Sequence, residues 1–547
     1  MTRPQQHVPP ASPAPTAPPP PTLARLVEHA AELHGPREAL VDGEVRWSFA
    51  RLAEEVARSA RAVLAAGLAP GDRVALWAPN SRQWITAALG ALSVGAVLVP
   101  VNTRYRPAEA ADVIRRSGAR LLFTERGFLG TDYPDALADS GEDLGTLGAA
   151  GPGAVVVLRG EPGRWRSWHE HLAAGARVPR AELRARRDAV RPEDVSDVLY
   201  TSGTTGRSKG VTALHGQAVR LYTAWAERVT LRAGDRYLLV NPFFHAFGWK
   251  AGVLACLLRG ATMLPEAVWD PRRAPARIAR ERISVLMGPP TLFHGLLRHP
   301  DLARHDLSSL RLAGTGAASI PTALVAEIRT GLGVPDVFTA YGLTESGGVV
   351  TVNPVDADAH TLAHTVGLPL PDTEVRIADP SGRSLPPGEP GEVQVRGYHV
   401  TPGYLDDPAA TAEAVLPDGW LRTGDVGTLD ERGYLTITDR LKDMYVVGGF
   451  NAYPAEVEQV LLTHPAVLDA AVVGAPDDRL GEVGVAFLVT ERELSEAELT
   501  AWSRERLANF KVPRRFARLP ELPRNAGGKV LKDPLRRAAR AATPTTP

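Results

Sequence analysis

Cysteine is almost absent from this chain, which has a single one, Cys256, among 547 residues. That excludes an intrachain disulfide and a zinc site built from several thiolates. Because Cys256 lies in the apolar run 253–258, we predict a buried thiol rather than a nucleophile. A chain without disulfides is typical of a reducing compartment, so we expect a cytoplasmic location.

The chain also lacks a net charge and a long apolar run. Its 62 basic residues equal its 62 acidic residues, so no overall field attracts nucleic acid, and we expect no nucleic-acid partner. The most hydrophobic stretch, residues 85–101, contains Gly90, Gly95 and Pro100 and is marginal in length for a bilayer. It predicts a buried helix followed by a strand, and no integral membrane segment.

What the sequence does contain is an alternation of helices and short apolar strands. It follows a proline-rich segment, 1–21, that we predict to be disordered. A helix over 52–66 and strands over 72–77 and 96–101 belong to this alternation, which predicts parallel sheets covered by helices. Beyond residue 365 the strands shorten and glycine turns become frequent, which predicts a small β subdomain.

A chain of 547 residues exceeds what one hydrophobic core usually serves, so we predict two folded domains. The first is a large N-terminal α/β domain at residues 22–439 with parallel sheets and the small β subdomain. The second is a small C-terminal α+β lid domain at 440–541, with a helix over 454–462 and a strand over 470–474. The predicted fold class is therefore α/β.

One loop rich in glycine and hydroxyl groups, residues 200–210, follows the end of an apolar strand. Its glycines permit tight turns that bring backbone N–H groups and hydroxyls close to phosphate oxygens, and a lysine adds positive charge. The spacing differs from the phosphate loop in which a lysine opens a helix. We predict that this loop binds phosphates through Thr201, Ser202, Gly203, Thr204, Thr205, Gly206 and Lys209.

The order of residues in this loop resembles the signature loop of the adenylate-forming (ANL) superfamily, in particular the acyl-CoA synthetases and fatty-acid–CoA ligases. Further segments downstream resemble that family in the same order, and the likeness covers nearly the whole chain after residue 21. The resemblance implies ATP, Mg²⁺ and coenzyme A as cofactors, and a small carboxylic acid as the substrate.

The segment 341–346 supplies residues for the nucleotide and the metal. An aromatic ring can stack on adenine, a hydroxyl can contact the α-phosphate, and a carboxylate can hold Mg²⁺. The resemblance implies these roles for Tyr341, Thr344 and Glu345, with Thr344 and Glu345 counted among the catalytic residues.

Two more segments are expected at the nucleoside. The small residues Gly316, Ala317 and Ala318 resemble the loop on which the adenine edge lies. The segment 419–425 ends in Asp425, and an ionised carboxylate suits the ribose diol because it only accepts hydrogen bonds. By resemblance, Arg440 also contacts the nucleotide.

The segment 241–252 is expected to wall the acyl site. The resemblance implies that His245 helps to place the carboxylate, beside Phe244 and Phe247. If the run is helical from residue 246, Phe247 and Lys250 share a face, and an aromatic ring beside a cation favours a ring-bearing acid with a distal polar group. The pattern also resembles actinobacterial ligases that act on steroid-ring fragments. Alternatively, Lys250 reaches solvent or pairs with a carboxylate.

The C-terminal part supplies a hinge and a mobile cation. The resemblance implies that Lys442 is the hinge residue and that Gly448 and Gly449 meet the second substrate. It also identifies Lys529 as the catalytic lysine. A point cation there would bridge two anions, the carboxylate and the α-phosphate, during adenylation.

The resemblance thus implies two half-reactions: a carboxylate attacks ATP to give an acyl-adenylate and pyrophosphate, and coenzyme A then takes the acyl group. We predict an acid–thiol ligase, an AMP-forming acyl-CoA synthetase of lipid or fatty-acid metabolism. A ligase that loads an acyl carrier protein shares all these segments, and a homologue could activate another oxyanion such as nitrite. Whether the chain forms a homodimer stays open.

Two other classes are less consistent with the sequence. An amino-acid-activating domain would carry an aspartate near Phe244, and this chain has none there. A non-catalytic nucleotide-binding paralogue would have no need of Glu345, Asp425, Arg440 and Lys529 together.

Overall fold

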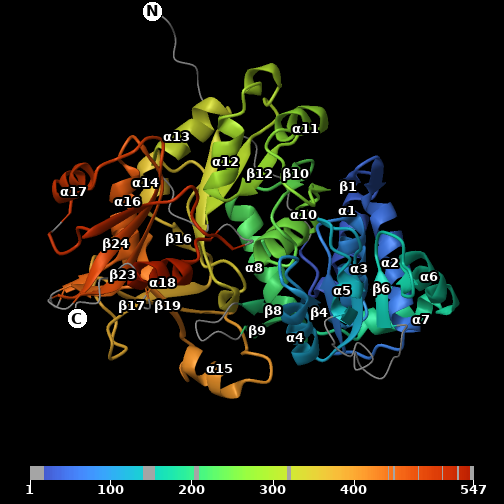
Figure 1. The fold of residues 1–547 in the computed structure, drawn as a ribbon. Coiled ribbons are helices and arrows are strands. Elements are labelled where there is room, and N and C mark those ends of the chain that lie inside the picture. The colour runs from blue at the N-terminus through green and yellow to red at the C-terminus, as the bar shows by residue number, and fades with distance from the viewer. Residues whose placement is uncertain are drawn as a thin grey trace, which may run out of the picture.

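The computed structural model describes residues 18–139, 154–201, 208–316, 322–440, 443–447, 450–477, 480–507, 509–525 and 529–541. Within these ranges the chain forms four β-sheets with helices packed around them (Figure 1). Two large sheets and a small antiparallel sheet come from the N-terminal part, and the fourth sheet ends the chain.

The first large sheet has the strand order β7-β6-β5-β3-β4-β8-β9 and is parallel except for β9, which runs antiparallel to β8. Its central strands are buried along nearly their whole length, as expected for a sheet covered on both faces. The strands are β3 (Arg73–Trp77), β4 (Val97–Pro100), β5 (Ala119–Thr124), β6 (Val155–Val157), β7 (Arg166–Ser167), β8 (Val195–Thr201) and β9 (Lys209–Leu214).

Helices from the same half of the chain pack around this sheet or against the helices that cover it, and the α2–α3 contact is the most extensive of these. The side chain of Ser48 accepts a hydrogen bond from the Arg51 N–H and so caps the start of α2. The helices are α1 (Leu26–His34), α2 (Phe49–Ala65), α3 (Arg82–Leu92), α4 (Pro107–Ser117), α5 (Tyr133–Asp139), α6 (Trp168–Ala174) and α7 (Arg180–Asp188).

The second large sheet has the order β16-β15-β14-β13-β12-β10-β11-β1-β2, and its six middle strands, from β14 to β1, are parallel. Parallel strands end at one edge of a sheet, which is where open α/β sheets bind ligands. The strands are β1 (Glu38–Asp42), β2 (Val45–Ser48), β10 (Arg236–Leu239), β11 (Thr262–Pro265), β12 (Val285–Gly288), β13 (Leu312–Gly316), β14 (Asp336–Tyr341), β15 (Thr351–Val352) and β16 (Leu368–Pro369).

The helices that connect these strands bury apolar faces against the sheet. One of them is irregular: α9 (Ala246–Gly248) continues through a π-helical turn, Trp249–Leu254, into α10 (Ala255–Arg259). The others are α8 (His215–Arg228), α11 (Ala274–Glu281), α12 (Pro290–Leu297), α13 (Thr322–Gly331) and α14 (Ala359–His364).

The small sheet is antiparallel, with the order β17-β18-β19-β20. It confirms the predicted β subdomain beyond residue 365. Its elements are β17 (Thr373–Ala378), β18 (Gly391–Gly397), α15 (Pro408–Ala414), β19 (Leu421–Leu429) and β20 (Leu435–Arg440).

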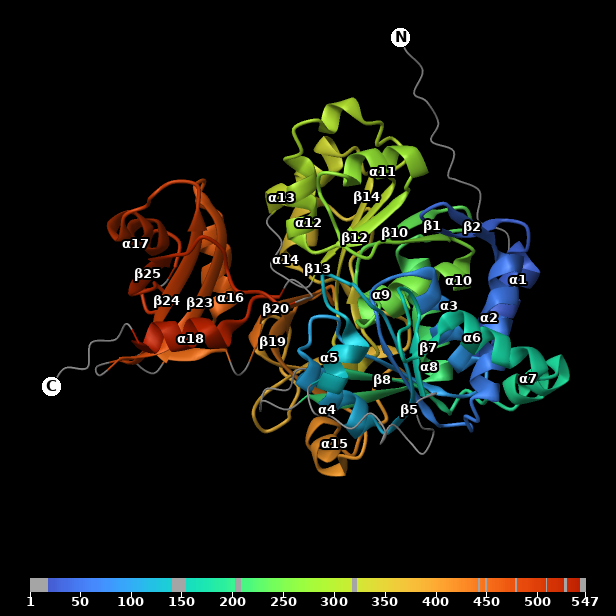
Figure 2. The same ribbon diagram turned by 45° about the vertical axis from the view of Figure 1, so that its right-hand side comes forward.

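The last sheet has the order β22-β21-β24-β23, with β25 parallel to β24, and three helices pack around it. Figure 2 shows this unit at one side of the molecule, beyond β20. Its elements are β21 (Tyr445–Val447), β22 (Phe450–Ala452), α16 (Pro454–Leu462), β23 (Val467–Asp477), β24 (Gly481–Thr490), α17 (Glu496–Arg504), β25 (Arg515–Arg518) and α18 (Lys532–Ala541).

The hydrophobic stretch 85–101 is core, as predicted: it forms most of α3, a turn and β4, all nearly inaccessible to solvent. Cys256 is also fully buried, in α10. Among the described residues, no helix is long and apolar enough to cross a bilayer.

Candidate active site

The residues predicted at the nucleoside lie on neighbouring strands. Tyr341 ends β14, and its hydroxyl donates a 2.6 Å hydrogen bond to Oδ2 of Asp425 on β19. Gly316 ends the adjacent strand β13, where it pairs with Ala340. Arg440 on β20 is the backbone partner of Asp425. Four positions far apart in the sequence therefore meet at one place.

Asp425 is only 4% exposed, and its bond to Tyr341 fixes the direction of the carboxylate. A further bond, from the Asp425 N–H to Oγ1 of Thr423, holds the backbone of this turn. A nearly buried carboxylate that only accepts hydrogen bonds can hold a pair of hydroxyls, as a ribose presents. Ala317 and Ala318 lie outside the described residues.

Thr344 and Glu345 follow β14 directly, in the 3₁₀ turn Thr344–Ser346, and both are half-buried. Oε1 of Glu345 accepts a 2.9 Å hydrogen bond from the hydroxyl of Tyr404. Its other oxygen, Oε2, has no hydrogen bond or ion pair from the described part of the chain. An available carboxylate oxygen at this position fits Mg²⁺, which binds through one or two carboxylates together with substrate phosphates.

The predicted phosphate loop connects β8 to β9 in a hairpin, in which Thr201 pairs with Lys209. At the base of the loop, the Arg116 guanidinium on α4 donates a 2.8 Å hydrogen bond to the carbonyl of Ser208 and lies over the ring of Tyr200. Ser202, Gly203, Thr204, Thr205 and Gly206 lie outside the described residues.

The segment predicted at the acyl site follows β10, at the same edge of the sheet. Asn80 fixes it: the amide of Asn80 donates to the carbonyls of Leu239 and Asn241, and its oxygen accepts from the Phe243 N–H. Gly248 allows a tight approach here, because a Cβ would lie 2.2 Å from the carbonyl oxygen of Pro242. The segment is therefore held rigidly to the sheet.

A helix does begin at residue 246, and His245 caps it, because its Nδ1 accepts a bond from the Phe247 N–H. The surrounding protein lowers the pKa of His245 below its ordinary value by desolvation, and the residue as a whole is exposed to solvent. Phe244 and Phe247 beside it are half-buried, and Phe247 packs against the main core.

Lys250 does not reach solvent. Its ammonium lies 2.8 Å from Oδ1 of Asp197 on β8, and the two side chains are 2% and 0% exposed. Of the two alternatives left open above, pairing with a carboxylate is the one observed. Oδ2 of the same carboxylate accepts a bond from Ser196 Oγ. The ion pair joins the π-helical turn to the strand that leads into the phosphate loop.

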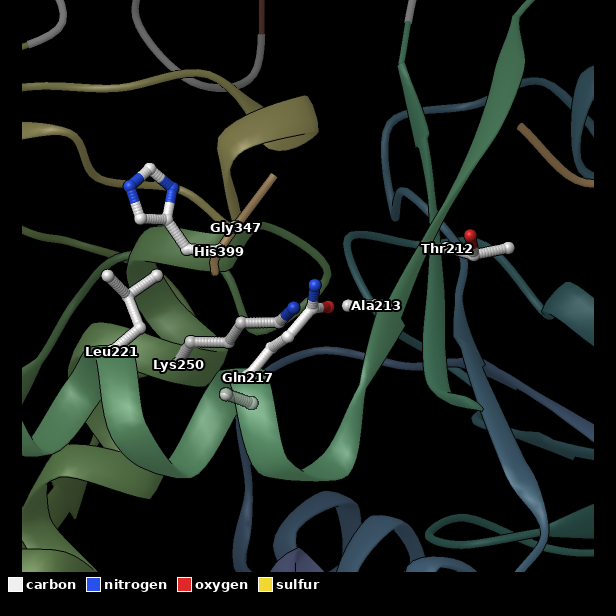
Figure 3. Close-up of a pocket in the computed structure, with 8 residues that line it drawn as sticks. Thr212, Ala213, Gln217, Leu221, Lys250, Gly347 and His399 are labelled. Atoms are coloured by element: carbon white, nitrogen blue, oxygen red, sulfur yellow. The ribbon is translucent and has the colours of Figure 1, made fainter. Parts of the chain in front are cut away.

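Beside this ion pair is a small cavity of about 10 Å³, close to what one water molecule needs. Figure 3 shows Lys250 and Gln217 extending from their helices toward the strand that carries Thr212 and Ala213. His399 lines the cavity as well. Lys250 is thus at an internal contact between elements, while His245 is exposed to solvent.

The C-terminal residues are described only in part. Lys529 is exposed, at a hairpin-like loop in which the Asn525 N–H bonds to its carbonyl and its own N–H bonds to Asn525 Oδ1. Lys442, Gly448 and Gly449 lie outside the described residues. A bridging role for Lys529 and a hinge at Lys442 therefore stay predictions.

Two family models match this chain: that of the AMP-binding enzymes over residues 27–405, and that of their C-terminal domain over residues 456–529. The chain belongs to the AMP-binding enzyme family. The predicted superfamily is thus confirmed.

Relatives that this chain matches over nearly their whole length support the family membership. The chain is 47% identical to a 3-[(3aS,4S,7aS)-7a-methyl-1,5-dioxo-octahydro-1H-inden-4-yl]propanoyl:CoA ligase of Rhodococcus jostii, over 94% of this chain and 98% of the relative. It is 48% identical to the ligase of the same name from Mycobacterium tuberculosis, with the same coverage. The solved anthranilate CoA ligase AuaEII, in complex with anthranoyl-AMP, superposes with a TM-score of 0.83 at 27% identity, over 96% and 98% of the two chains. This likeness confirms the predicted fold class.

Proposed function

We propose that this AMP-binding enzyme is an ATP-dependent acyl-CoA ligase whose acid is a compact, ring-bearing propanoic acid. The ligase class agrees with the relatives, which are CoA ligases. The observation that carries the substrate class is the 47–48% identity, over 94% of the chain, to two ligases of one bicyclic propanoic acid. Identity to the anthranilate ligase is 27%.

The surroundings of the acyl segment support a wide acid rather than a long chain. Two buried rings of the segment, Phe243 and Trp249, pack against the buried Trp84 of α3, with ring centroids 5.1 Å and 5.2 Å from that of Trp84. A long acyl chain needs a tunnel, and we infer that three packed rings leave little room for one here. An interior packed to this density resists displacement.

In the first half-reaction the substrate carboxylate attacks the α-phosphate of ATP, and pyrophosphate leaves. Tyr341 stacks on the adenine and Asp425 accepts the ribose hydroxyls, while Lys209 and the loop before it hold the phosphates. Mg²⁺, when bound at Glu345, supplies positive charge against the phosphate oxygens. Catalysis here consists of positioning and charge neutralisation more than covalent participation by the protein.

In the second half-reaction the thiol of coenzyme A attacks the acyl carbon and AMP leaves. We propose that rotation about Lys442 withdraws Lys529 and presents Gly448 and Gly449 to the pantetheine arm. A hinge of a few residues outside both domains' cores can absorb such a rotation.

A pyrophosphate-release screen tests the proposal. We expect the highest specificity constant for the hydroindane-dione propanoic acid, lower values for cyclohexylpropanoic and cinnamic acids, and very low values for palmitic acid. A preference for palmitic acid would contradict the substrate class. ATP binding without pyrophosphate release on any acid would indicate the non-catalytic alternative.

The same screen decides the acceptor. Each active acid is tested with coenzyme A and, separately, with a phosphopantetheinylated acyl carrier protein. Thioester formation on the carrier protein alone would replace coenzyme A in the proposal.

A further inference from the structure

Tyr404 lies between two residues of the candidate site that come from different parts of the chain. Its hydroxyl donates the 2.9 Å hydrogen bond to Oε1 of Glu345, the predicted magnesium ligand. Its ring faces the ammonium of Lys209, the cation of the phosphate loop, with Nζ 4.9 Å from the ring centre. One side chain thus contacts both groups that are expected to meet the phosphates of ATP.

The backbone around Tyr404 is bound to the same two elements. We call residues 401–405 the strap. The Leu405 N–H donates to the carbonyl of Gly210, next to Lys209, over 2.7 Å, and Tyr404 forms a β-bridge with Val211. At the other end of the strap, the Thr401 N–H donates to the carbonyl of Glu345 over 2.8 Å.

The strap is itself fixed in place. Oγ1 of Thr401 donates to the carbonyl of Thr212 over 2.7 Å, and Oγ1 of Thr411 accepts from the Tyr404 N–H over 2.9 Å. Gly403 has a φ of +151°, and a Cβ at this position would lie 2.8 Å from Thr411. The backbone that carries the Tyr404 ring therefore has little freedom, so the position of the ring is set before any ligand binds.

The chemistry of the phenol suits this place. A phenol hydroxyl can donate a hydrogen bond, and that of Tyr404 donates to the Glu345 carboxylate. The bond occupies Oε1 of Glu345 and leaves Oε2 for a metal ion. The electron-rich face of the ring attracts the Lys209 ammonium without neutralising it, as a carboxylate would.

We propose that Tyr404 is a positioning residue for the adenylation half-reaction: it aims the Glu345 carboxylate at the metal and holds Lys209 at a fixed distance from it. The inference rests on the proposed function, because it assigns both contacts to the Mg·ATP complex. It adds a residue from a segment that carries none of the predicted site residues.

Two substitutions separate the roles of the hydroxyl and the ring. Tyr404→Phe removes the hydrogen bond to Glu345 and keeps the ring under Lys209, while Tyr404→Leu removes both. Tyr398→Phe is the matched control. Tyr398 is also half-buried and has a cation, Arg220, over its ring at 3.9 Å, and the described part of the chain gives its hydroxyl no hydrogen bond.

Binding of the non-hydrolysable nucleotide α,β-methylene-ATP is measured by calorimetry with Mg²⁺ and with EDTA, next to acid-dependent ATP–pyrophosphate exchange. For Tyr404→Phe we expect Mg²⁺-dependent binding and exchange to fall about 10- to 100-fold, the range for a hydrogen bond to a charged group. Binding in EDTA and thioester formation from preformed acyl-adenylate should change less than twofold. Tyr404→Leu should in addition weaken binding in EDTA, because Lys209 loses its support.

Each result decides the inference. Unchanged Mg²⁺-dependent binding in Tyr404→Phe would overturn it, and so would equal losses with Mg²⁺ and EDTA, which would indicate a merely structural tyrosine. A loss as large in Tyr398→Phe would overturn it as well. If the wild type binds the nucleotide but exchanges pyrophosphate with no acid, the proposed function fails, and the Mg²⁺ titration of the variants still decides the role of Tyr404.

Discussion

Replacing Lys250 by methionine tests whether its buried ion pair with Asp197 is structural. The ammonium and carboxylate are 2.8 Å apart and almost inaccessible to solvent. At that distance two unit charges attract by about 6 kcal/mol at an effective dielectric constant near 20. Lys250→Met keeps most of the side-chain volume and leaves the Asp197 carboxylate buried, with Ser196 as its remaining hydrogen-bond donor among the described residues.

We expect Lys250→Met to lose about 3–5 kcal/mol of unfolding free energy, because removal of one partner leaves an uncompensated charge in the interior. Lys250→Met combined with Asp197→Asn should recover a large part of the loss. With a urea slope of about 3 kcal/mol per M or more for a domain of this size, the midpoint should fall by roughly 1 M.

Intrinsic fluorescence is a suitable readout, because nine of the ten tryptophans precede residue 440 and report on the N-terminal part. Arg25→Met is the matched control. Arg25 forms an ion pair of the same length, 2.8 Å, with Asp188, but both side chains are about half exposed. Such a pair contributes at most about 1 kcal/mol.

A Lys250→Met midpoint equal to that of Arg25→Met would refute the reasoning, and so would a double variant no more stable than the single one. A structural lysine also predicts that the variant, assayed where it is folded, keeps the wild-type ranking of acids. If the variant selectively lost activity on acids with a distal polar group, Lys250 would instead be assigned to the substrate pocket.

Three further changes test the site, and one tests pH dependence. Lys529→Ala should lose orders of magnitude in acyl-adenylate formation, measured by pyrophosphate exchange, and still convert preformed acyl-adenylate and coenzyme A to thioester. Lys442→Pro, which fixes φ and removes an N–H, should keep pyrophosphate exchange and lose thioester synthesis. Tyr341→Phe removes the bond to Asp425 and should raise the KM for ATP about tenfold, with thermal stability as the control. Burial lowers the pKa of His215 to about 4, below its unfolded value near 6.5, so its contribution to stability is present above pH 6.5 and is lost as the pH falls toward 4. Between pH 7.5 and pH 5.0, protonation of His215 in the unfolded state should lower the unfolding free energy by about 2 kcal/mol. His215→Leu should abolish this loss, so its urea midpoint should fall less over the same pH range.

Particular outcomes would contradict these expectations. Equal loss of both half-reactions in Lys529→Ala would argue against alternating domain positions, and an unchanged overall rate in Lys442→Pro would place the hinge elsewhere. An unaltered KM in Tyr341→Phe would mean that the hydroxyl does not orient Asp425. A His215→Leu slope equal to the wild-type slope would assign the acid sensitivity to other groups.

The local elements were largely predictable from the sequence, because they follow from local chemistry. The helix predicted over residues 454–462 has those bounds, Pro454–Leu462, since proline suits the first helical position. The strand predicted over 470–474 is longer, Val467–Asp477, because its antiparallel partner Gly481–Thr490 extends the pairing at both ends. That extension depends on the partner strand and could not be predicted from the residues of the strand itself.

The same limit applies to the site. Tyr341 and Asp425 were predictable because each stands in a long motif. Tyr404 was missed, because the residues around it are typical of a turn and its contact with Glu345 spans 59 positions. Asn80 was missed for the same reason. For Lys250 the sequence supplied the charge but not the partner, which only the packing of two distant elements provides.

The π-helical turn at residues 249–254 has a consequence for how relatives of this enzyme diversify. A π turn holds one more residue than an α turn, and π bulges often occur at functional sites. Removing a single residue there would restore α geometry and rotate every side chain after it by about 100° relative to those before it. The fully buried β11 beyond the helix fixes its far end, so the rotation would fall on the residues before the turn, which belong to the segment predicted to wall the acyl site. We therefore expect single-residue insertions and deletions in this turn to change acid specificity, and a small library of length variants would test that expectation.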